Sequence, residues 1–113
     1  MKKVLLIDDS ESLHAYCHNE LEDEIEIFDA YSKEEAEELF NSTPDLAAIV
    51  VDACVPGHEP NTQDLVEMFR KTFQGPIIAV SSSLEYRNVL VSAGCSHDCS
   101  KFDLLYKLLE ILK

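Results

Sequence analysis

Short apolar runs alternate with longer amphipathic segments along the whole chain. Nearly continuous apolar runs occupy residues 3–7, 46–51 and 77–80, which is typical of strands buried on both faces of a sheet. Residues 24–30 alternate between apolar and polar side chains, and residues 95–100 form a weaker run of the same kind. Both stretches are also interpreted as strands, the first of them at a sheet edge. The pattern therefore predicts five strands.

Helical periodicity fills the intervals between these strands. The predicted helices cover residues 11–23, 32–41, 62–73, 84–93 and 103–112. Ser10 offers N-cap chemistry for the first helix, Ser32 and Glu35 form a capping box for the second, and Gly94 is a suitable C-cap for the fourth. Strand followed by helix, five times over, predicts one α/β domain over residues 1–113, with a parallel sheet and helices on both faces.

The last predicted helix carries an apolar stripe. We expect Leu104, Leu105, Leu108 and Leu109 to face the core. Hydrophobic residues make up 46% of the chain, which is enough to build such a core and too many for a disordered segment.

The chain is strongly acidic, with 9 Lys and Arg against 22 Asp and Glu and a net charge of −13. A field of this sign repels nucleic-acid phosphates and attracts metal cations or basic protein surfaces. The longest apolar run, residues 46–51, is far shorter than the ~20 residues of a membrane helix, and residues 4–7 are too few for a signal-peptide core. We expect a cytoplasmic protein that binds neither nucleic acid nor a membrane directly.

The four cysteines are expected to be reduced and to act as small hydrophobic residues. They are Cys17, Cys54, Cys95 and Cys99. On one strand, Cys95 and Cys99 would lie roughly 13 Å apart. A disulfide needs Cα atoms within about 7 Å, so this pair is not expected to close.

Polar residues stand where the predicted strands end. Asp8 and Asp9 follow the first strand, Asp52 ends the third, Ser81 ends the fourth and Lys101 ends the fifth. The carboxyl ends of parallel strands meet at one rim of the sheet, which is where ligands bind in such folds. The sequence therefore predicts a site at this rim.

The composition of this rim points to a metal and a phosphoryl group. If the first and third strands are neighbours, three carboxylates share one pocket, and two charges ~4 Å apart repel by about 4 kcal/mol at an effective dielectric near 20. A bound proton or cation relieves that repulsion. Carboxylate oxygens suit Mg²⁺, Lys101 adds positive charge and Ser81 adds a hydroxyl donor. Together these groups are what transfer of a phosphoryl group to a carboxylate requires.

Five motifs resemble those of response-regulator receiver domains, in the same order along the chain. Residues 4–10 resemble the family's opening strand, and residues 44–52 resemble its phosphoacceptor strand. Residues 55–57 resemble the loop after that strand, and residues 77–82 resemble the strand that carries the switch hydroxyl. Residues 93–94, followed by Lys101, resemble the end of the domain. The resemblance covers essentially the whole chain and is closest to single-domain, chemotaxis-regulator-like proteins. It implies a flavodoxin-like (βα)5 doubly wound sheet with strand order 2-1-3-4-5.

The resemblance also implies a magnesium site. Asp9 would bind Mg²⁺ directly, Asp8 mainly through water, and Asp52 and the backbone carbonyl of Cys54 would complete the protein ligands. Mg²⁺ is the only cofactor that it implies.

By the same resemblance, Asp52 is the phosphoacceptor, Ser81 binds the phosphoryl group and Lys101 pairs with one of its oxygens. The donor would be a sensor histidine kinase, a phosphotransfer protein or a small phosphodonor. The protein would then act as a signalling switch by docking to a downstream protein whose identity the sequence does not give, and not as an enzyme beyond its own phosphorylation and dephosphorylation.

Three features depart from the family pattern. Asp98 stands where the family commonly has a switch aromatic, Phe102 replaces the proline after the lysine, and the loop of residues 53–62 is about two residues longer, with Pro60 where glycine is usual. We expect a trans peptide bond before Phe102, because a cis bond there costs ~3 kcal/mol. An atypical receiver that binds partners without being phosphorylated is therefore an alternative hypothesis.

An enzyme on the same architecture is the third hypothesis. A phosphatase would need a second acid two residues after Asp52, where Cys54 stands. A flavin-type protein would need a phosphate-cradling loop after the first strand, where two acids stand instead.

One helix carries His14, Cys17 and His18 at a spacing that can hold a transition metal. The sequence offers no evident fourth ligand, so we interpret these three as partly exposed surface residues. His58 lies in the loop near the site, but a histidine in a loop usually has no specific role.

Overall fold

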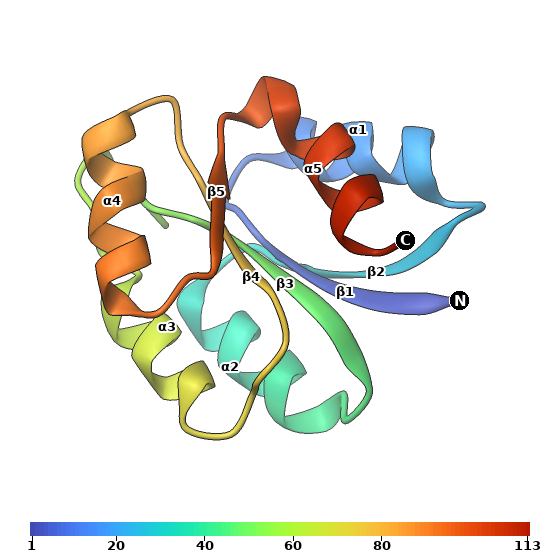
Figure 1. Ribbon diagram of the computed structural model, residues 1–113, viewed down its shortest axis with the longest axis horizontal. Coiled ribbons are helices and arrows are strands. Elements are labelled where there is room, and N and C mark those ends of the chain that lie inside the picture. The colour runs from blue at the N-terminus through green and yellow to red at the C-terminus, as the bar shows by residue number, and fades with distance from the viewer.

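The computed structural model describes all 113 residues and contains a five-stranded parallel sheet in the order β2-β1-β3-β4-β5 (Figure 1). Its elements, in chain order, are β1 (Lys2–Ile7), α1 (Glu11–Leu21), β2 (Ile25–Ala30), α2 (Lys33–Ser42), β3 (Leu46–Asp52), α3 (Gln63–Arg70), β4 (Ile77–Val80), α4 (Leu84–Ala93), β5 (His97–Cys99), a 3-10 turn η1 (Lys101–Asp103) and α5 (Leu104–Ile111). The predicted flavodoxin-like order 2-1-3-4-5 is confirmed.

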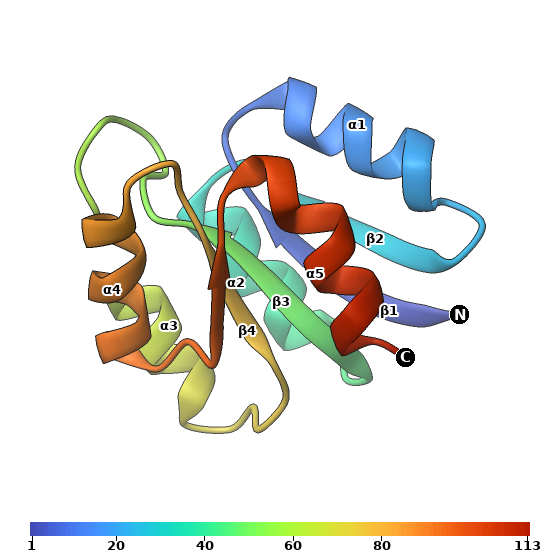
Figure 2. The ribbon, with the colours of Figure 1, turned by 45° about the horizontal axis from the view of Figure 1, so that its top comes forward.

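Helices cover both faces of the sheet. α1 and α5 lie on one face, and α2, α3 and α4 lie on the other (Figure 2). Each face has its own apolar cluster, and alternate residues of the central strands supply both. Leu5 and Ile49 point into the cluster under α2, α3 and α4, whereas Leu6 and Val50 point into the cluster under α1 and α5. Burial on both faces explains why β1, β3 and β4 read as continuous apolar runs.

The helix ends follow the predicted capping chemistry with one exception. The Glu35 amide donates to Ser32 Oγ at 3.1 Å, as predicted for the capping box. Gly94 ends α4 with φ +136°, a conformation that favours glycine. Ser10 stands at the N-cap of α1, but its hydroxyl makes no cap bond. Instead the Ser10 amide donates to Asp8 Oδ1 at 2.7 Å, so the turn into α1 is shaped by a residue of the site.

Several boundaries and burial predictions need correction. β5 is only three residues long, α3 ends at Arg70, and the last helix begins as a 3-10 turn. Leu104 and Leu108 are buried as predicted, but Leu109 is 36% exposed because α5 meets the sheet along a narrower stripe. The interpretation of His14 and Cys17 as partly exposed was wrong. Both are buried, on the side of α1 that faces β1 and β2.

The rim at the amino ends of β4 and β5 is tied together by Arg70. Its guanidinium donates to the backbone carbonyls of Gly94 at 2.7 Å, Phe73 at 3.1 Å and Gly75 at 2.6 Å. A Cβ on Gly94 would lie 2.8 Å from Arg70 Cγ, so the close approach of the two segments requires a glycine. One side chain thus links the ends of α3 and α4 to the start of β4.

All four cysteines are free thiols, and none of the helices is long and apolar enough to cross a membrane.

Candidate functional site

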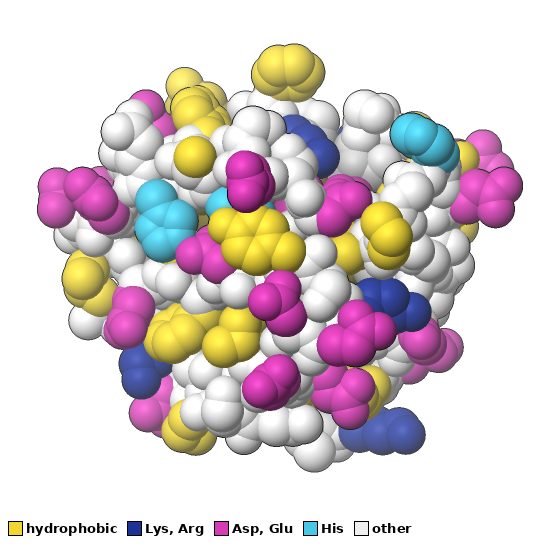
Figure 3. Space-filling view, turned by 180° about the vertical axis from the view of Figure 1, so that it is seen from behind, with side chains coloured by type: hydrophobic (Ala, Val, Ile, Leu, Met, Phe, Trp, Pro, Cys, Tyr) yellow, Lys and Arg dark blue, Asp and Glu magenta, His cyan; other side chains and the backbone are white.

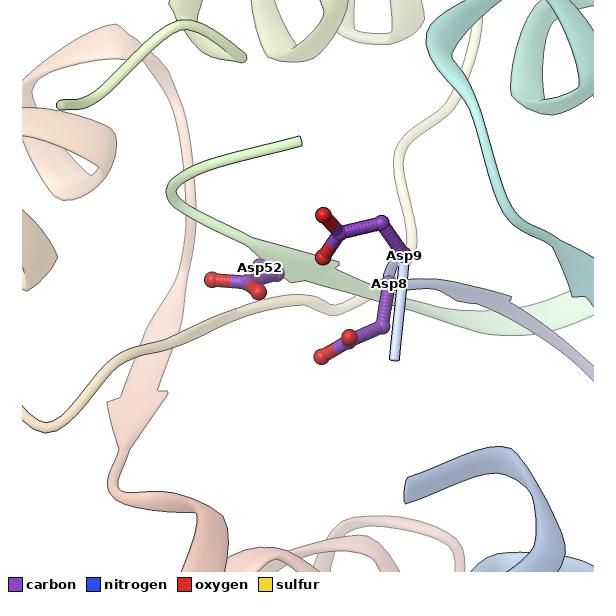
Figure 4. A group of neighbouring side chains, drawn as sticks. All are labelled: Asp8, Asp9 and Asp52. Atoms are coloured by element: carbon purple, nitrogen blue, oxygen red, sulfur yellow. The ribbon is translucent and has the colours of Figure 1, made fainter. Parts of the chain in front are cut away.

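Three aspartates converge at the carboxyl ends of β1 and β3 (Figure 4). The two strands are hydrogen-bonded neighbours with Ile7 opposite Val51, which brings Asp8 and Asp52 side by side one residue later. One carboxylate oxygen from each of Asp8, Asp9 and Asp52 lies within 4.8 Å of the others. Asp8 and Asp52 are buried, whereas Asp9 is exposed at the mouth of the site.

Lys101 reaches this cluster from the end of β5, the edge strand that lies two positions from β3. It begins η1, just after β5, and its Nζ lies 3.3 Å from Asp8 Oδ2 and 3.6 Å from Asp52 Oδ2. Its side chain is 43% exposed, so the amine is reachable from solvent while it contacts two buried acids. The peptide bond before Phe102 is trans, as predicted, and the Phe102 side chain is 93% exposed beside the site.

The buried acids are electrostatically strained. Burial, followed by the charge of Asp8, raises the pKa of Asp52 from 3.8 to about 6, although the Cys54 amide at 3.2 Å and the Lys101 amine act in the opposite direction. Partial burial works against the charge of Lys101, but Asp8 and Asp52 outweigh it, and the pKa of Lys101 is raised. One positive charge therefore faces three carboxylates.

The residues of this cluster fit a hard divalent cation. Asp8 Oδ2 is fully buried and accepts no hydrogen bond, although Lys101 lies nearby. A buried carboxylate oxygen is costly unless a donor or a cation contacts it, and the Lys101 ammonium, 3.3 Å away, is shared between Asp8 and Asp52. Oxygen-only donors from several carboxylates are the ligands that Mg²⁺ prefers. The cluster can therefore hold Mg²⁺ through Asp8, Asp9 and Asp52.

A hollow of about 550 Å³ lies over Asp9 and Asp52. Its lining residues are Asp9, Asp52, Cys54, Gly57, His58, Ser81, Ser82, Ser83, Tyr86 and Lys101. Ser81 is nearly buried at the end of β4, and its Oγ accepts the Ser83 amide at 3.1 Å, which leaves the hydroxyl proton available to a ligand. The hollow is large enough for a phosphoryl group next to Asp52.

The loop after Asp52 is held by two residues that the sequence did not single out. The buried Thr62 hydroxyl lies 2.9 Å from the Asp52 carbonyl and 3.2 Å from the Ala53 carbonyl. Asn61 accepts the Val55 amide at 2.7 Å and donates to the Pro56 carbonyl at 2.9 Å. Both residues precede α3, where polar side chains also read as ordinary helix-start residues, so the sequence carries no separate signal for this role.

Asp98, which stands where receiver domains commonly have an aromatic switch residue, forms an ion pair with Arg87. Arg87 Nε donates to Asp98 Oδ2 at 2.9 Å, and Arg87 Nη1 donates to the Ser81 carbonyl at 2.9 Å. Arg87 therefore joins α4 to the ends of both β4 and β5. Neither the pair nor its contact with Ser81 could be read from the sequence, because 11 residues separate the partners.

This fold, with its acidic cluster and lysine at the carboxyl rim, has the architecture of CheY-like response-regulator receiver domains, and solved structures of that class match the chain over nearly its whole length. The response regulator TrrA of Thermotoga maritima, solved in complex with Mg²⁺-BeF, is 27% identical, with all of both chains covered and a TM-score of 0.81.

Two further structures show the same likeness. The chemotaxis response regulator CheY4 of Vibrio cholerae is 23% identical, with 98% of each chain covered and a TM-score of 0.79. A Burkholderia pseudomallei response regulator with a phosphorylated aspartic acid is 20% identical, covering 100% of this chain and 67% of that one, with a TM-score of 0.82. No protein-family model matches the chain, and no curated protein matches it.

Proposed function

We propose that this chain is a response-regulator receiver that accepts a phosphoryl group on Asp52 with the help of Mg²⁺. The observation that carries the proposal is the convergence of three carboxylates and one amine around a single hollow, with Lys101 Nζ within 3.6 Å of both Asp8 and Asp52. Capping and surface pairing do not explain this set, because two of the acids are buried. Among its structural neighbours, one was solved with Mg²⁺-BeF and another with a phosphorylated aspartate.

Each side chain has a distinct part in the proposed transfer. An oxygen of Asp52 attacks the phosphorus of the donor and an O–P bond forms, while the N–P bond of a phosphohistidine breaks and its imidazole takes up a proton from solvent. Lys101 pairs with a phosphoryl oxygen, and the Ser81 hydroxyl donates to another. A Mg²⁺ ion would be held by Asp9, Asp52 and the Cys54 carbonyl, and by Asp8 mainly through water, and it would supply the positive charge that the transferred group requires.

The partners follow from this chemistry. The phosphodonor is a sensor histidine kinase or a phosphotransfer protein, and the signal leaves by docking to a downstream protein. The net charge of −13 favours partners with basic surfaces and disfavours direct contact with nucleic acid. A cytoplasmic location, where such kinases expose their phosphohistidine, belongs to the same proposal.

The test is phosphorylation by a small donor. The protein is incubated with acetyl phosphate or phosphoramidate, with and without Mg²⁺, and its intact mass is measured. We expect a gain of one phosphoryl group that requires Mg²⁺, is absent from Asp52→Asn and persists in the control Asp45→Asn, which alters an exposed acid. No gain in the wild-type protein would count against the proposal.

A phosphorylation-independent interaction module is the second candidate, and the Arg87–Asp98 pair favours it. Arg87 bonds to the Ser81 carbonyl as well as to Asp98, so it fixes Ser81 relative to α4 without any phosphoryl group being bound. This candidate is supported if Asp52→Asn leaves binding to the cognate partner and cellular output unchanged, and it is excluded if that variant abolishes them.

A further inference from the structure

A second cluster of ligand-type side chains lies between α1 and β2, outside the proposed phosphorylation site. His14 and His18 are one helical turn apart on α1, and both point to the carboxylate of Asp29 on β2. His14 Nδ1 lies 2.5 Å from Asp29 Oδ1, and His18 Nε2 lies 2.6 Å from Asp29 Oδ2. Figure 3, which views the molecule from behind, shows histidine side chains beside an acidic one on the surface. Asp29 thus joins the two histidines as a third ligand-type side chain, which the spacing along the helix did not indicate.

The second ring nitrogen of His14 makes this cluster unusual. His14 is 1% exposed, and its Nε2 lies 2.7 Å from the backbone carbonyl oxygen of Asp8. A carbonyl oxygen only accepts, so Nε2 carries a hydrogen and donates it. In neutral His14 this leaves a lone pair on Nδ1, which faces the lone pairs of the Asp29 carboxylate at 2.5 Å. Only a proton or a metal cation between the two atoms makes that contact favourable.

We propose that His14 Nδ1, His18 Nε2 and the Asp29 carboxylate form a binding site for a divalent transition-metal ion of the Zn²⁺ type. Metal-bound histidines characteristically donate their other ring N–H to a backbone carbonyl, as His14 does to Asp8. The metal displaces the hydrogen between His14 and Asp29, which leaves as a proton to solvent. Three protein ligands leave one position for water, typical of an open zinc site.

Metal binding requires one side chain to turn. The ring nitrogens of His14 and His18 contact opposite oxygens of Asp29 and do not lie within 4.8 Å of each other, whereas ligand atoms ~2.0–2.2 Å from one tetrahedral ion are about 3.3 Å apart. His14 is held in the core by its bond to the Asp8 carbonyl, so the more exposed ring of His18 must swing towards it. The side chains of His18 and Asp29 are 43% and 26% exposed, which provides both room and an entry path. The ring of Tyr31, 4.1 Å from that of His14, covers the buried ligand.

The neighbouring thiol is not part of the proposed site. Cys17 lies on the same helix face, but burial, then the charges of Asp29 and Asp8, raise its pKa to about 11, so it stays a neutral thiol within the core. The ligand set therefore contains two nitrogens and a carboxylate, which selects Zn²⁺, Ni²⁺, Co²⁺ or Cu²⁺ over Mg²⁺. The two proposed cation sites thus differ in ligand chemistry, although the bond from His14 to the Asp8 carbonyl joins them.

The test is a calorimetric titration of the full chain with Zn²⁺ in the presence of excess Mg²⁺, which fills the aspartate cluster. We expect one Zn²⁺ per chain in the wild-type protein, and an affinity lowered by more than about 100-fold in both His18→Ala and Asp29→Asn, since loss of an outer-shell partner alone costs 10–100-fold. His97→Ala, which alters a histidine on β5, is the matched control and keeps full affinity.

Histidine-selective NMR of the same samples provides a second readout that does not depend on the variants folding. Stoichiometric Zn²⁺ should shift the ring signals of His14 and His18 and leave those of His58 and His97 unchanged. The proposal is overturned if the wild-type protein binds no Zn²⁺, if His18→Ala and Asp29→Asn bind it as tightly as the wild type, or if the ring of His58, which lines the phosphorylation hollow, shifts instead. None of these outcomes affects the Asp52 proposal, which is tested with Mg²⁺ alone.

Discussion

Replacing Asp52 by asparagine should stabilise the metal-free protein at neutral pH. The carboxylate of Asp52 is buried next to Asp8, and its pKa is raised from 3.8 to about 6. The ionised form is therefore penalised in the native state by about two pH units, which corresponds to about 3 kcal/mol at 1.36 kcal/mol per unit. Asparagine has the same shape and can still accept the Cys54 amide, so most of this cost should be recovered.

The sign of the pH dependence follows from proton binding. Between about pH 4 and pH 6 the native protein retains the Asp52 proton and the unfolded chain has released it, so the free energy of unfolding falls as the pH rises through this window. The cost is complete above the native pKa and absent when both states are protonated. The stabilisation by Asp52→Asn should thus be about 2–3 kcal/mol near pH 7.5 and small near pH 4.

Urea unfolding in EDTA, followed by circular dichroism at both pH values, measures this difference. Asp45→Asn, at an exposed position, is the matched control and should change stability by less than about 0.5 kcal/mol. Repeating the experiment with Mg²⁺ should reduce the difference in free energy of unfolding between Asp52→Asn and the wild type, because the cation neutralises the acids and binds only the native wild-type cluster tightly. A variant no more stable than the wild type near pH 7.5 without metal, or a gain that is the same at both pH values, would refute this electrostatic reasoning.

Three further substitutions probe the site and its support. Lys101→Met removes the only cationic side chain within 4 Å of Asp8 and Asp52. It should slow phosphorylation by acetyl phosphate roughly 100-fold, and the exposed control Lys71→Met should not. An equal phosphorylation rate in the two variants would rule out a role for the Lys101 amine. Thr62→Val removes the buried hydroxyl that donates to the Asp52 carbonyl, whereas the Ala53 carbonyl keeps the Asn61 amide as a donor. The substitution should lower the free energy of unfolding in urea by about 1–2 kcal/mol, and a neutral effect would contradict a structural role for this hydroxyl. Phe69→Ala empties a fully buried position and should cost about 3–5 kcal/mol by the same assay, with a loss below about 1 kcal/mol contradicting the described packing.

Local pattern was sufficient to predict the strands, the helices and the rim where the polar residues meet. β1, β3 and β4 are buried on both faces, so their apolar runs carry a strong signal. The convergence of Asp8, Asp52 and Lys101 follows from parallel strands, whose carboxyl ends share one rim once β1 and β3 are neighbours. Topology turned three distant positions in the sequence into one site.

Features that depend on contacts between distant side chains could not be predicted in this way. The burial of His14 depends on Asp29 and the Asp8 carbonyl, which are brought to it by the packing of α1 over β1 and β2. The pairing of Arg87 with Asp98 likewise requires the crossover from α4 to β5. A histidine or an aspartate in a single sequence carries the same signal whether it is exposed or paired, so periodicity alone cannot separate the two.

The three carbonyl contacts of Arg70 have a consequence for how α4 can move. They fix the carboxyl end of this helix to the start of β4, at the edge farthest from Asp52. Its amino end, just beyond Ser81, is held by the side chain of Arg87, which bonds to Asp98 and to the Ser81 carbonyl. A displacement of Ser81 that breaks the Arg87 contacts would therefore tilt α4 about its anchored carboxyl end. The largest movement would occur at the amino end of the helix, next to the hollow over Asp52.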